Sequence, residues 1–292
     1  MATNSVAYHS VIDGASPQRH PVSGSVVLQR HEFNWIKDYL YKQAGIVLND
    51  SKHALVSGRL DKRLRHLGFS SYSDYFRQFG KPGFERETVM ALDLLTTNET
   101  YFFREHKHFE FLQCALFEAS AGRPLRFWSA ASSSGEEAYT LAMLAAEYAR
   151  SRQWEIIGTD LSTRMLDKAR QGLYPLPAAE KIPVRLLKKY CLRGNGDYEG
   201  FFLIQQALRD RVSFMRANLI DNLPDLGVFD VIFLRNVMIY FDMPTKQRLV
   251  ERIQHYLRPG GYFIISHSES LNGIRHRLQM ISPSIYQRKR DD

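Results

Sequence analysis

The feature that most limits the fold of this chain is the alternation, after Pro124, of short apolar runs with longer amphipathic stretches. Apolar runs that end at turn residues and precede a helical period are typical of parallel strands joined by crossover helices. We therefore predict an α/β fold with a doubly wound sheet. The predicted strands are "LRFWSAAS", "WEIIGTD", "VSFMRANL", "FDVIFLRNVMIYF" and "GGYFIISHSES", with "LQMISPSIYQRK" as edge strands at the end.

Amphipathic stretches supply the crossover helices. "GEEAYTLAMLAAEYAR" follows the first strand, and "STRMLDKARQGLY" follows the second with Ser162 as its predicted N-cap. A third helix, "MPTKQRLVERIQHYLRPGG", is predicted to stop at Pro259 and the glycines after it. Between Pro175 and Arg211 the pattern breaks, and the turn-rich "RGNGD" with short extended pieces predicts an inserted antiparallel β-subdomain at about 178–211.

The part of the chain before this pattern is predicted to be a small helical domain. "FNWIKDYLYKQAG" places Phe33, Ile36 and Leu40 on one face and ends at Gly45, a residue suited to a helix C-terminus. "SKHALVSGRLDKRLRHLG" is the next predicted helix. The predicted division is a disordered tail at 1–27, a helical domain with its linker at 28–112, and the α/β domain at 113–292.

One side of that second predicted helix is basic. A turn of about 100 degrees per residue groups Lys52, Arg59, Lys62, Arg63 and His66 beside the apolar stripe. Together with the formal net charge of +8, this sector favours an acidic partner, which could be nucleic acid, an anionic membrane surface or an acidic protein. A solvated helix face explains the same charges without any partner.

The two cysteines and the hydropathy pattern limit the remaining possibilities. Cys114 and Cys191 lack the spacing of metal ligands, so both are interpreted as packing residues, with no disulfide and no metal site expected. No run of about 18 apolar residues is present, and the first residues lack the pattern of a signal peptide. We expect a cytoplasmic monomer that does not insert into a membrane.

The ligand of an open α/β sheet lies beyond the carboxyl ends of its strands. The first predicted strand ends in small residues and leads to Glu136 and Glu137 in the first turn of a helix. Two carboxylates would repel a pyrophosphate, and the glycine pattern of dinucleotide folds is missing, so NAD is disfavoured. An acidic first turn suits a ligand with a cationic or hydroxyl-rich face, although stabilisation of the helix dipole explains either glutamate alone.

Polar residues end the next three predicted strands as well. Asp160 can accept hydrogen bonds from both hydroxyls of a ribose, and Asn218 and Asn236 can each donate and accept near an adenine or an amino-acid group. The alternative for Asp160 is an Asx turn before Ser162, and the asparagines taken singly are ordinary turn residues. Polar groups at four consecutive strand ends favour a binding site.

The linker "LTTNETYFFRE" places polar groups among three aromatic residues. A bound ligand would explain the polar groups of Asn98, Thr100 and Arg104, since each of them needs a partner. The alternative is a capped interdomain linker in which Arg104 pairs with Glu99 or Glu105 at the surface.

In their order and spacing, these motifs resemble the chemotaxis receptor methyltransferase family, CheR. The resemblance spans about 28–288 and includes "LTTNETYFFRE", "WSAASSSGEEAYTLAM", "GTDLSTRMLDKARQGLY", "FLRNVMIYF" and "LRPGGYFIISHSES". It implies a Rossmann-like S-adenosylmethionine-dependent methyltransferase sheet with an N-terminal all-helical domain and a small inserted antiparallel β-subdomain. Carried over by position, the implied cofactor contacts are Asn98, Thr100, Arg104, Glu136, Asp160, Asn218, Leu219, Asn236 and Val237.

The implied reaction is transfer of a methyl group from S-adenosylmethionine to glutamate side chains of membrane chemoreceptors, which gives γ-glutamyl methyl esters and S-adenosylhomocysteine. Arg104 and Tyr240 are implied to face the substrate. The basic sector around Arg59, Lys62 and Arg63 would then dock acidic, helical receptor segments. The resemblance also allows a receptor C-terminal peptide to bind the β-subdomain by strand addition, although the sequence there does not decide this.

Two other functions compete with this interpretation. A nucleic-acid methyltransferase would suit the positive charge, but "NVMIY" departs from the N-P-P-Y arrangement of base-modifying enzymes, and no aromatic and basic groove is evident. A non-catalytic regulator that only senses S-adenosylmethionine would keep the cofactor residues. The presence of Arg104 and Tyr240 argues against this second alternative.

Overall fold

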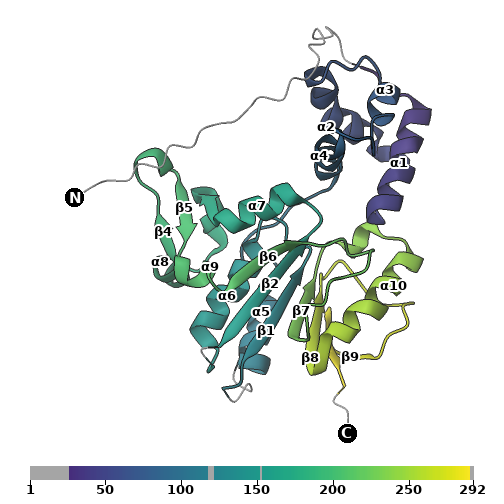
Figure 1. Ribbon diagram of the computed structural model, residues 1–292. Coiled ribbons are helices and arrows are strands. Elements are labelled where there is room, and N and C mark those ends of the chain that lie inside the picture. The colour runs from purple at the N-terminus through teal and green to yellow at the C-terminus, as the bar shows by residue number, and fades with distance from the viewer. Residues whose placement is uncertain (1–25, 118–121, 152, 290–292) are drawn as a thin grey trace.

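A computed structural model describes residues 26–117, 122–151 and 153–289. A group of helices at the start of the chain lies at one end of a seven-stranded sheet, and a three-stranded sheet forms a separate unit (Figure 1). Of the predicted tail at 1–27, only residues 26 and 27 fall within the described part. The predicted fold class, an α/β sheet with a helical domain and a small antiparallel insert, is confirmed.

The helical group packs around its own core. The predicted helix ends as expected, since Gly45 adopts the left-handed conformation with φ 70° and its N–H donates to the carbonyl of Tyr41. Fully buried side chains come from the predicted stripes, among them Phe33, Ile36 and Leu60. The helices are α1 (Arg30–Ala44), α2 (His53–His66), α3 (Tyr72–Phe76) and α4 (Glu85–Leu95), with a 3₁₀ turn η1 (Asp50–Lys52) before α2.

The large sheet has the order β6-β2-β1-β7-β8-β10-β9. The pairs from β6 to β8 are parallel, and β10 runs antiparallel to both of its neighbours. β1 therefore lies near the centre of the sheet, and later strands add on both sides of it. The strands are β1 (Leu125–Ala130), β2 (Trp154–Asp160), β6 (Val212–Arg216), β7 (Phe229–Leu234), β8 (Leu257–Ile265), β9 (Leu278–Ser282) and β10 (Ile285–Arg288).

Neighbouring strand residues point into two different cores, as expected for a sheet covered on both faces. Phe127 and Val231 belong to one hydrophobic cluster, and Trp128 and Ile232 belong to the other. The first cluster includes side chains of α5, η2 and α6, and the second includes side chains of α10. The covering helices are α5 (Lys107–Leu112), η2 (Gln113–Phe117), α6 (Glu136–Tyr148), α7 (Thr163–Gln171) and α10 (Met243–Ile253).

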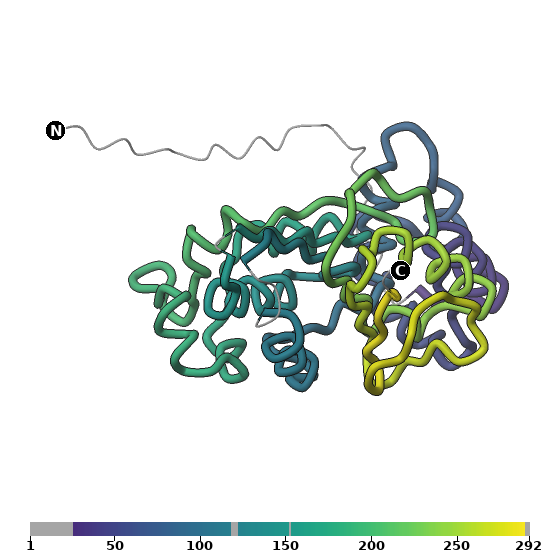
Figure 2. Tube along the Cα trace, turned by 90° about the horizontal axis from the view of Figure 1, so that it is seen from below, coloured from purple at the N-terminus to yellow at the C-terminus, as the bar shows by residue number. Residues whose placement is uncertain are grey.

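The inserted unit is an antiparallel sheet of order β3-β5-β4 with short helices beside it. Figures 1 and 2 both show this unit and the helical domain on opposite sides of the large sheet. β4 bonds only to β5 within the described residues, so it is an edge strand. The elements are β3 (Leu173–Pro175), η3 (Leu176–Lys181), α8 (Val184–Tyr190), β4 (Cys191–Arg193), η4 (Gly196–Tyr198), β5 (Phe201–Ile204) and α9 (Gln206–Arg209).

Several local expectations differ from the structure. α10 continues only through a 3₁₀ turn, η6 (Gln254–Tyr256), so the helix ends before Pro259. Pro259 and the glycines after it lie inside β8, where the missing side chain of Gly261 lets the backbone of Asp230 approach closely. The motif "MIY" is the 3₁₀ turn η5 (Met238–Tyr240) and not strand. Of the two strands predicted as edges at the end of the chain, β10 lies inside the sheet and β9 is an edge.

The two cysteines are free thiols, but they differ in burial. Cys191 is half-buried and packs against the first core, as predicted. Cys114 is exposed, so its interpretation as a packing residue is wrong. None of the described helices is long and apolar enough to cross a membrane.

Candidate active site

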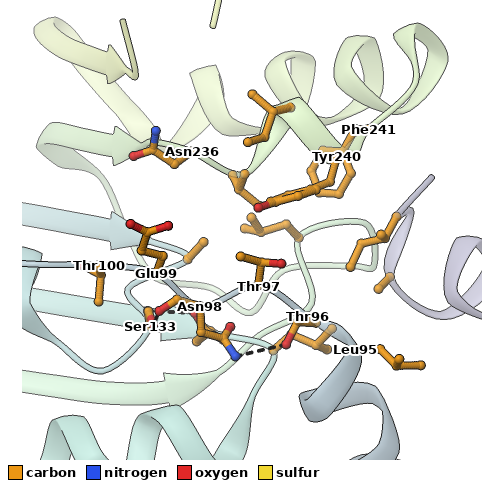
Figure 3. Close-up of a pocket in the computed structure, with 18 of the residues that line it drawn as sticks. Leu95, Thr96, Thr97, Asn98, Glu99, Thr100, Ser133, Asn236, Tyr240 and Phe241 are labelled. Atoms are coloured by element: carbon orange, nitrogen blue, oxygen red, sulfur yellow. Dashed lines mark hydrogen bonds between the residues drawn. The ribbon is translucent and has the colours of Figure 1, made fainter. Parts of the chain in front are cut away.

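A cavity of about 500 Å³ lies between the helical domain and the carboxyl ends of the central strands. Its volume is in the range of cavities that enclose one cofactor-sized molecule. The helical domain contributes one wall through Ala44–Asn49 and α2, and the ends of β1, β2, β6 and β7 contribute the opposite wall. Figure 3 shows the linker after α4 crossing between Ser133 on one side and Asn236 with Tyr240 on the other.

The loop after β1 forms the floor of the cavity with an unusual backbone. Ala131 and Ser133 have φ of 68° and 48°, a conformation that costs free energy in non-glycine residues and is held only by strong local constraints. Those constraints include a hydrogen bond of 2.8 Å from the Ser132 N–H to the Thr159 carbonyl. Ser132 lines the cavity, but its hydroxyl is buried beside Gly158, and no partner for it is found among the described residues.

Asp160 ends β2 at the cavity and is only 8% exposed. Its carboxylate accepts one hydrogen bond from the Ser133 N–H at 2.8 Å and another from the Ser162 N–H at 2.9 Å. The predicted Asx-type bond to Ser162 is therefore present, together with a bond that fixes the loop after β1. Burial raises the pKa of Asp160 to about 6, against the opposing effect of these hydrogen bonds. The carboxylate keeps further lone pairs for a diol.

The linker residues also reach the cavity. Asn98 and Thr100 line it, and the Asn98 carbonyl accepts a hydrogen bond of 3.0 Å from the Ser133 hydroxyl (Figure 3). The Asn98 amide group donates to the Thr96 hydroxyl at 3.1 Å. Phe102 is fully buried against the inserted unit, 5.0 Å from the ring of Tyr174. The linker is thus anchored by an aromatic ring and presents polar groups to the cavity.

Arg104 lies in the cavity wall with a half-buried side chain. Its guanidinium donates to the backbone carbonyl of Glu99 at 2.8 Å and lies 5.4 Å from the ring centre of Tyr101. Within the described part of the chain, no ion pair joins Arg104 to the carboxylate of Glu99 or Glu105, so the alternative of a surface salt bridge is not found there. The guanidinium keeps donors for an incoming anion.

Glu137, and not the predicted Glu136, faces the cavity. Glu137 lines it and accepts hydrogen bonds from the Ser129 hydroxyl at 2.6 Å and from Arg235 Nε at 2.8 Å. The Glu136 carboxylate turns away, accepts from the Ser134 hydroxyl, and lies outside the cavity lining. Successive helix residues point about 100 degrees apart, so only one of the pair can face the strand ends. Burial raises the pKa of Glu136 to about 7.

Arg235 was not identified from the sequence, although it directly follows β7. It is 6% exposed and lines the cavity. Its Nη1 donates to the backbone carbonyl of Arg104 at 2.7 Å and contacts His108 Nδ1 at 3.1 Å. The rule that strand ends carry the site could have found it, since it precedes Asn236 in "LRNVM".

The remaining predicted cofactor residues also line the cavity, but their side chains have protein partners. The Asn218 amide group donates to the Gln43 carbonyl at 2.7 Å, which ties the sheet to α1. Asn236, with φ 58°, donates through its side chain to Ser266 at 2.7 Å. Leu219 and Val237 complete this wall. Asn218 and Asn236 thus shape the cavity as well as facing it.

The half-buried carboxylate of Glu269 holds the turn that carries Tyr240. Glu269 accepts hydrogen bonds from the backbone N–H groups of Asn236, Met238 and Ile239 at 3.1, 2.8 and 3.3 Å. Tyr240 lines the cavity, and its carbonyl accepts the Val47 N–H at 2.8 Å. The turn is therefore fixed to both domains, so Tyr240 has a defined position relative to the helical wall.

The basic residues of α2 are less free than the sequence suggests. Arg59 donates to the carbonyls of Leu95 and Thr96 at the end of α4, at 3.1 and 2.9 Å. Arg63 forms an ion pair with Glu87. Both guanidinium groups therefore stabilise the helical domain. Lys52, Lys62 and His66 are exposed, and Lys52 and Arg59 line the helical side of the cavity.

A cluster of Glu105, His108 and His267 adjoins the cavity wall and has the residue types of a metal site. Both imidazoles bond to the same hydroxyl, that of Ser284, at 2.7 Å from His108 and 3.0 Å from His267. The Arg235 guanidinium next to His108 opposes a second cation there, since like charges repel. Burial, aided by Arg235, lowers the pKa of His108 to about 3. The cluster is better described as a hydrogen-bonded support, and the expected lack of a metal stays a prediction.

The cavity fits a ligand with hydroxyl and cationic groups. Asp160 offers carboxylate oxygens at the end of β2. Glu99 adds a second carboxylate to the cavity wall, and the carboxylate of Glu137 is paired with Arg235. A ribose diol, an ammonium and a sulfonium suit this set, whereas a pyrophosphate does not. These are the groups of S-adenosylmethionine.

Comparison with known proteins agrees with this geometry. Residues 98–286 match the family model described as "CheR methyltransferase, SAM binding domain", and residues 31–96 match "CheR methyltransferase, all-alpha domain". Chemotaxis protein methyltransferase 2 of Pseudomonas aeruginosa is 41% identical over 262 residues, which covers 88% of this chain and 92% of that protein. The chemotaxis protein methyltransferase of Escherichia coli is 35% identical and covers 91% of this chain and 93% of its own. The chain therefore belongs to the CheR methyltransferase family, and its cofactor is S-adenosylmethionine.

Proposed function

We propose that this protein methylates glutamate side chains in the cytoplasmic, helical segments of membrane chemoreceptors and produces γ-glutamyl methyl esters. One observation carries the proposal: Arg104 and Tyr240 line the same cavity as the cofactor residues. An arginine and a phenol beside a methyl donor suit a carboxylate acceptor. The names of the relatives support a role in chemotaxis.

Bound S-adenosylmethionine supplies an electrophilic methyl group on a sulfonium. The acceptor needs no general base, because an ordinary glutamate has a pKa of about 4.3 and is already ionised at neutral pH. One carboxylate oxygen forms the new bond to carbon as the bond from carbon to sulfur breaks, and the electron pair of that bond leaves with sulfur. The sulfonium and the carboxylate both lose their charge in this step, so the protein must align the acceptor and exclude water.

Arg104 would attract and orient the acceptor through part of its guanidinium, because another part is already bonded to the Glu99 carbonyl. A tight bidentate pair would stabilise the carboxylate before reaction and slow the transfer, so a single contact is preferable. Tyr240 would donate to the second carboxylate oxygen. Its turn is held by Glu269 and by Val47, so the phenol reaches the acceptor without large rearrangement.

The partner would dock beside the helical wall of the cavity. Lys52, Lys62 and His66 are the exposed basic residues of the predicted sector, and they suit acidic side chains of a receptor helix through electrostatic steering. The edge strand β4 has free backbone groups for a receptor C-terminal peptide that adds as a strand. The cavity is complete without a peptide bound at β4. We propose a cytoplasmic monomer.

Labelled cofactor tests this proposal against both alternatives. The protein is incubated with chemoreceptor cytoplasmic fragments, with DNA and with RNA, and the label is then tested for release by mild base. A γ-glutamyl methyl ester is labile to base, and label of this kind on the receptor fragment supports the proposal. Stable label on nucleic acid would favour a base-modifying enzyme, and cofactor binding without any transfer would favour a regulator.

A further inference from the structure

The backbone around Arg104 adopts a turn that these residues do not favour. Phe103 and Glu105, on either side of Arg104, have φ of 56° and 58°. Such a conformation costs free energy in a non-glycine residue and persists only where its surroundings hold it. The direction in which the Arg104 side chain leaves the backbone is set by this turn.

Contacts from three separate parts of the α/β domain hold the turn. The Phe103 N–H donates to the Thr140 hydroxyl of α6 at 3.2 Å. The Glu105 carboxylate accepts from the Ser266 hydroxyl after β8 at 2.7 Å. The central peptide is held by Arg235, which donates to the Arg104 carbonyl at 2.7 Å. Arg235 is thus the contact closest to the arginine that would meet the substrate.

Arg235 is itself fixed on every side. Its Nε donates to Glu137, its Nη1 contacts His108 Nδ1, and its guanidinium lies 5.5 and 5.4 Å from the rings of Phe109 and Phe233. Because a guanidinium only donates, Nδ1 of His108 must accept, so His108 is neutral and its Nε2 proton bonds to Ser284. A less tightly held arginine could change its orientation, but Arg235 cannot do so without breaking several hydrogen bonds.

We propose that Arg235 is a positioning residue for methyl transfer: held by Glu137 and His108, it fixes the strained turn that aims Arg104 at the acceptor carboxylate. The proposal rests on the proposed function, because it concerns the rate of that reaction. Arg235 acts through the backbone of Arg104, so its effect should disappear once the Arg104 side chain is gone.

A double-mutant cycle tests this coupling. Arg235→Lys shortens the side chain and removes the planar fork, so we expect kcat on a receptor fragment to fall about 30- to 100-fold, since a misplacement of about 1 Å costs about 10²-fold. KM for the fragment and Kd for S-adenosylhomocysteine should change less than threefold. In the Arg104→Ala background, Arg235→Lys should lower kcat less than threefold further, because the two changes remove the same interaction.

A matched control and a second variant keep the test decisive. Arg288→Lys alters a half-buried arginine that, like Arg235, donates to a backbone carbonyl, here that of Leu257 at the start of β8, and it should leave kcat unchanged in both backgrounds. Should Arg235→Lys fail to fold, His108→Gln takes its place with the same expected pattern, since it removes the Nδ1 acceptor that holds Arg235 and His108 lies outside the cavity lining. Additive losses in the cycle would overturn the proposal. An inactive wild type would instead refute the proposed function.

Discussion

The ionisation of Asp160 predicts that cofactor affinity and protein stability respond to pH in opposite directions. Folding raises the pKa of this carboxyl group to about 6, mainly through burial, from an ordinary value of about 3.9. An ionised Asp160 can accept both ribose hydroxyls, whereas a protonated one keeps a proton on one oxygen. If only the ionised form binds, Kd for S-adenosylhomocysteine should rise about tenfold between pH 8 and pH 5.

The stability of the ligand-free protein should move the other way. Between about pH 4 and pH 6 the folded protein holds a proton on Asp160 that the unfolded chain has released, so unfolding releases a proton. A raised carboxyl pKa therefore stabilises the folded state as the pH falls through this window, by up to about 1.4 kcal/mol per pH unit. Above pH 6 the cost of the buried charge is present in full.

Titration calorimetry and urea unfolding across pH 5–8 measure the two responses. Asp160→Asn should bind S-adenosylhomocysteine more weakly at pH 8. Its affinity and its stability should both depend less on pH than those of the wild type. Glu136→Gln is the matched control for the affinity response, because Glu136 has a pKa raised to about 7 but lies outside the cavity. The reasoning fails if wild-type affinity is the same at pH 5 and pH 8, or if the affinity response is lost in the control and kept in Asp160→Asn.

Other consequences can be measured directly. Gly45→Ala should lower the free energy of unfolding in urea by about 2–4 kcal/mol, because its Cβ would lie 2.8 Å from a side chain of the sheet domain. Gly80 also has a positive φ but lies in open space, so Gly80→Ala should lower the same free energy by about 1 kcal/mol. Arg104→Ala and Tyr240→Phe should lower turnover at least tenfold while calorimetry finds cofactor Kd within threefold; unchanged turnover would remove both from the proposed catalytic set. Lys62→Glu should slow receptor methylation at low salt and converge with wild type at high salt, without loss of stability.

The strand-end rule explains why much of the cavity could be predicted. Asp160 and Asn236 follow apolar runs whose period identifies them as strands, and parallel strands bring their carboxyl ends to one edge. The residues on the helical side were harder to place. The polar group of Arg104 is explained by a ligand or by a capped linker, and only the resemblance to a family favours the ligand, because no periodic pattern places an irregular linker in space.

The differences from expectation share a physical origin in contacts between distant residues. Glu136 and Glu137 are adjacent residues of one type, and only the packing of α6 on the sheet decides which of them faces β1. The helical pattern predicts a basic sector on α2, but Arg63 pairs with Glu87 from another helix, and a local pattern does not contain that pairing. The position of β10 inside the sheet is likewise a matter of long-range pairing.

The most direct test of the central claim is tandem mass spectrometry of a chemoreceptor cytoplasmic fragment after incubation with this protein and S-adenosylmethionine. The expected product carries a methyl ester on glutamate side chains of its helical segment, and Arg104→Ala should abolish most of it while still binding the cofactor. Methyl groups found on other residue types, or none on a fragment incubated with cofactor-bound wild type, would contradict the claim.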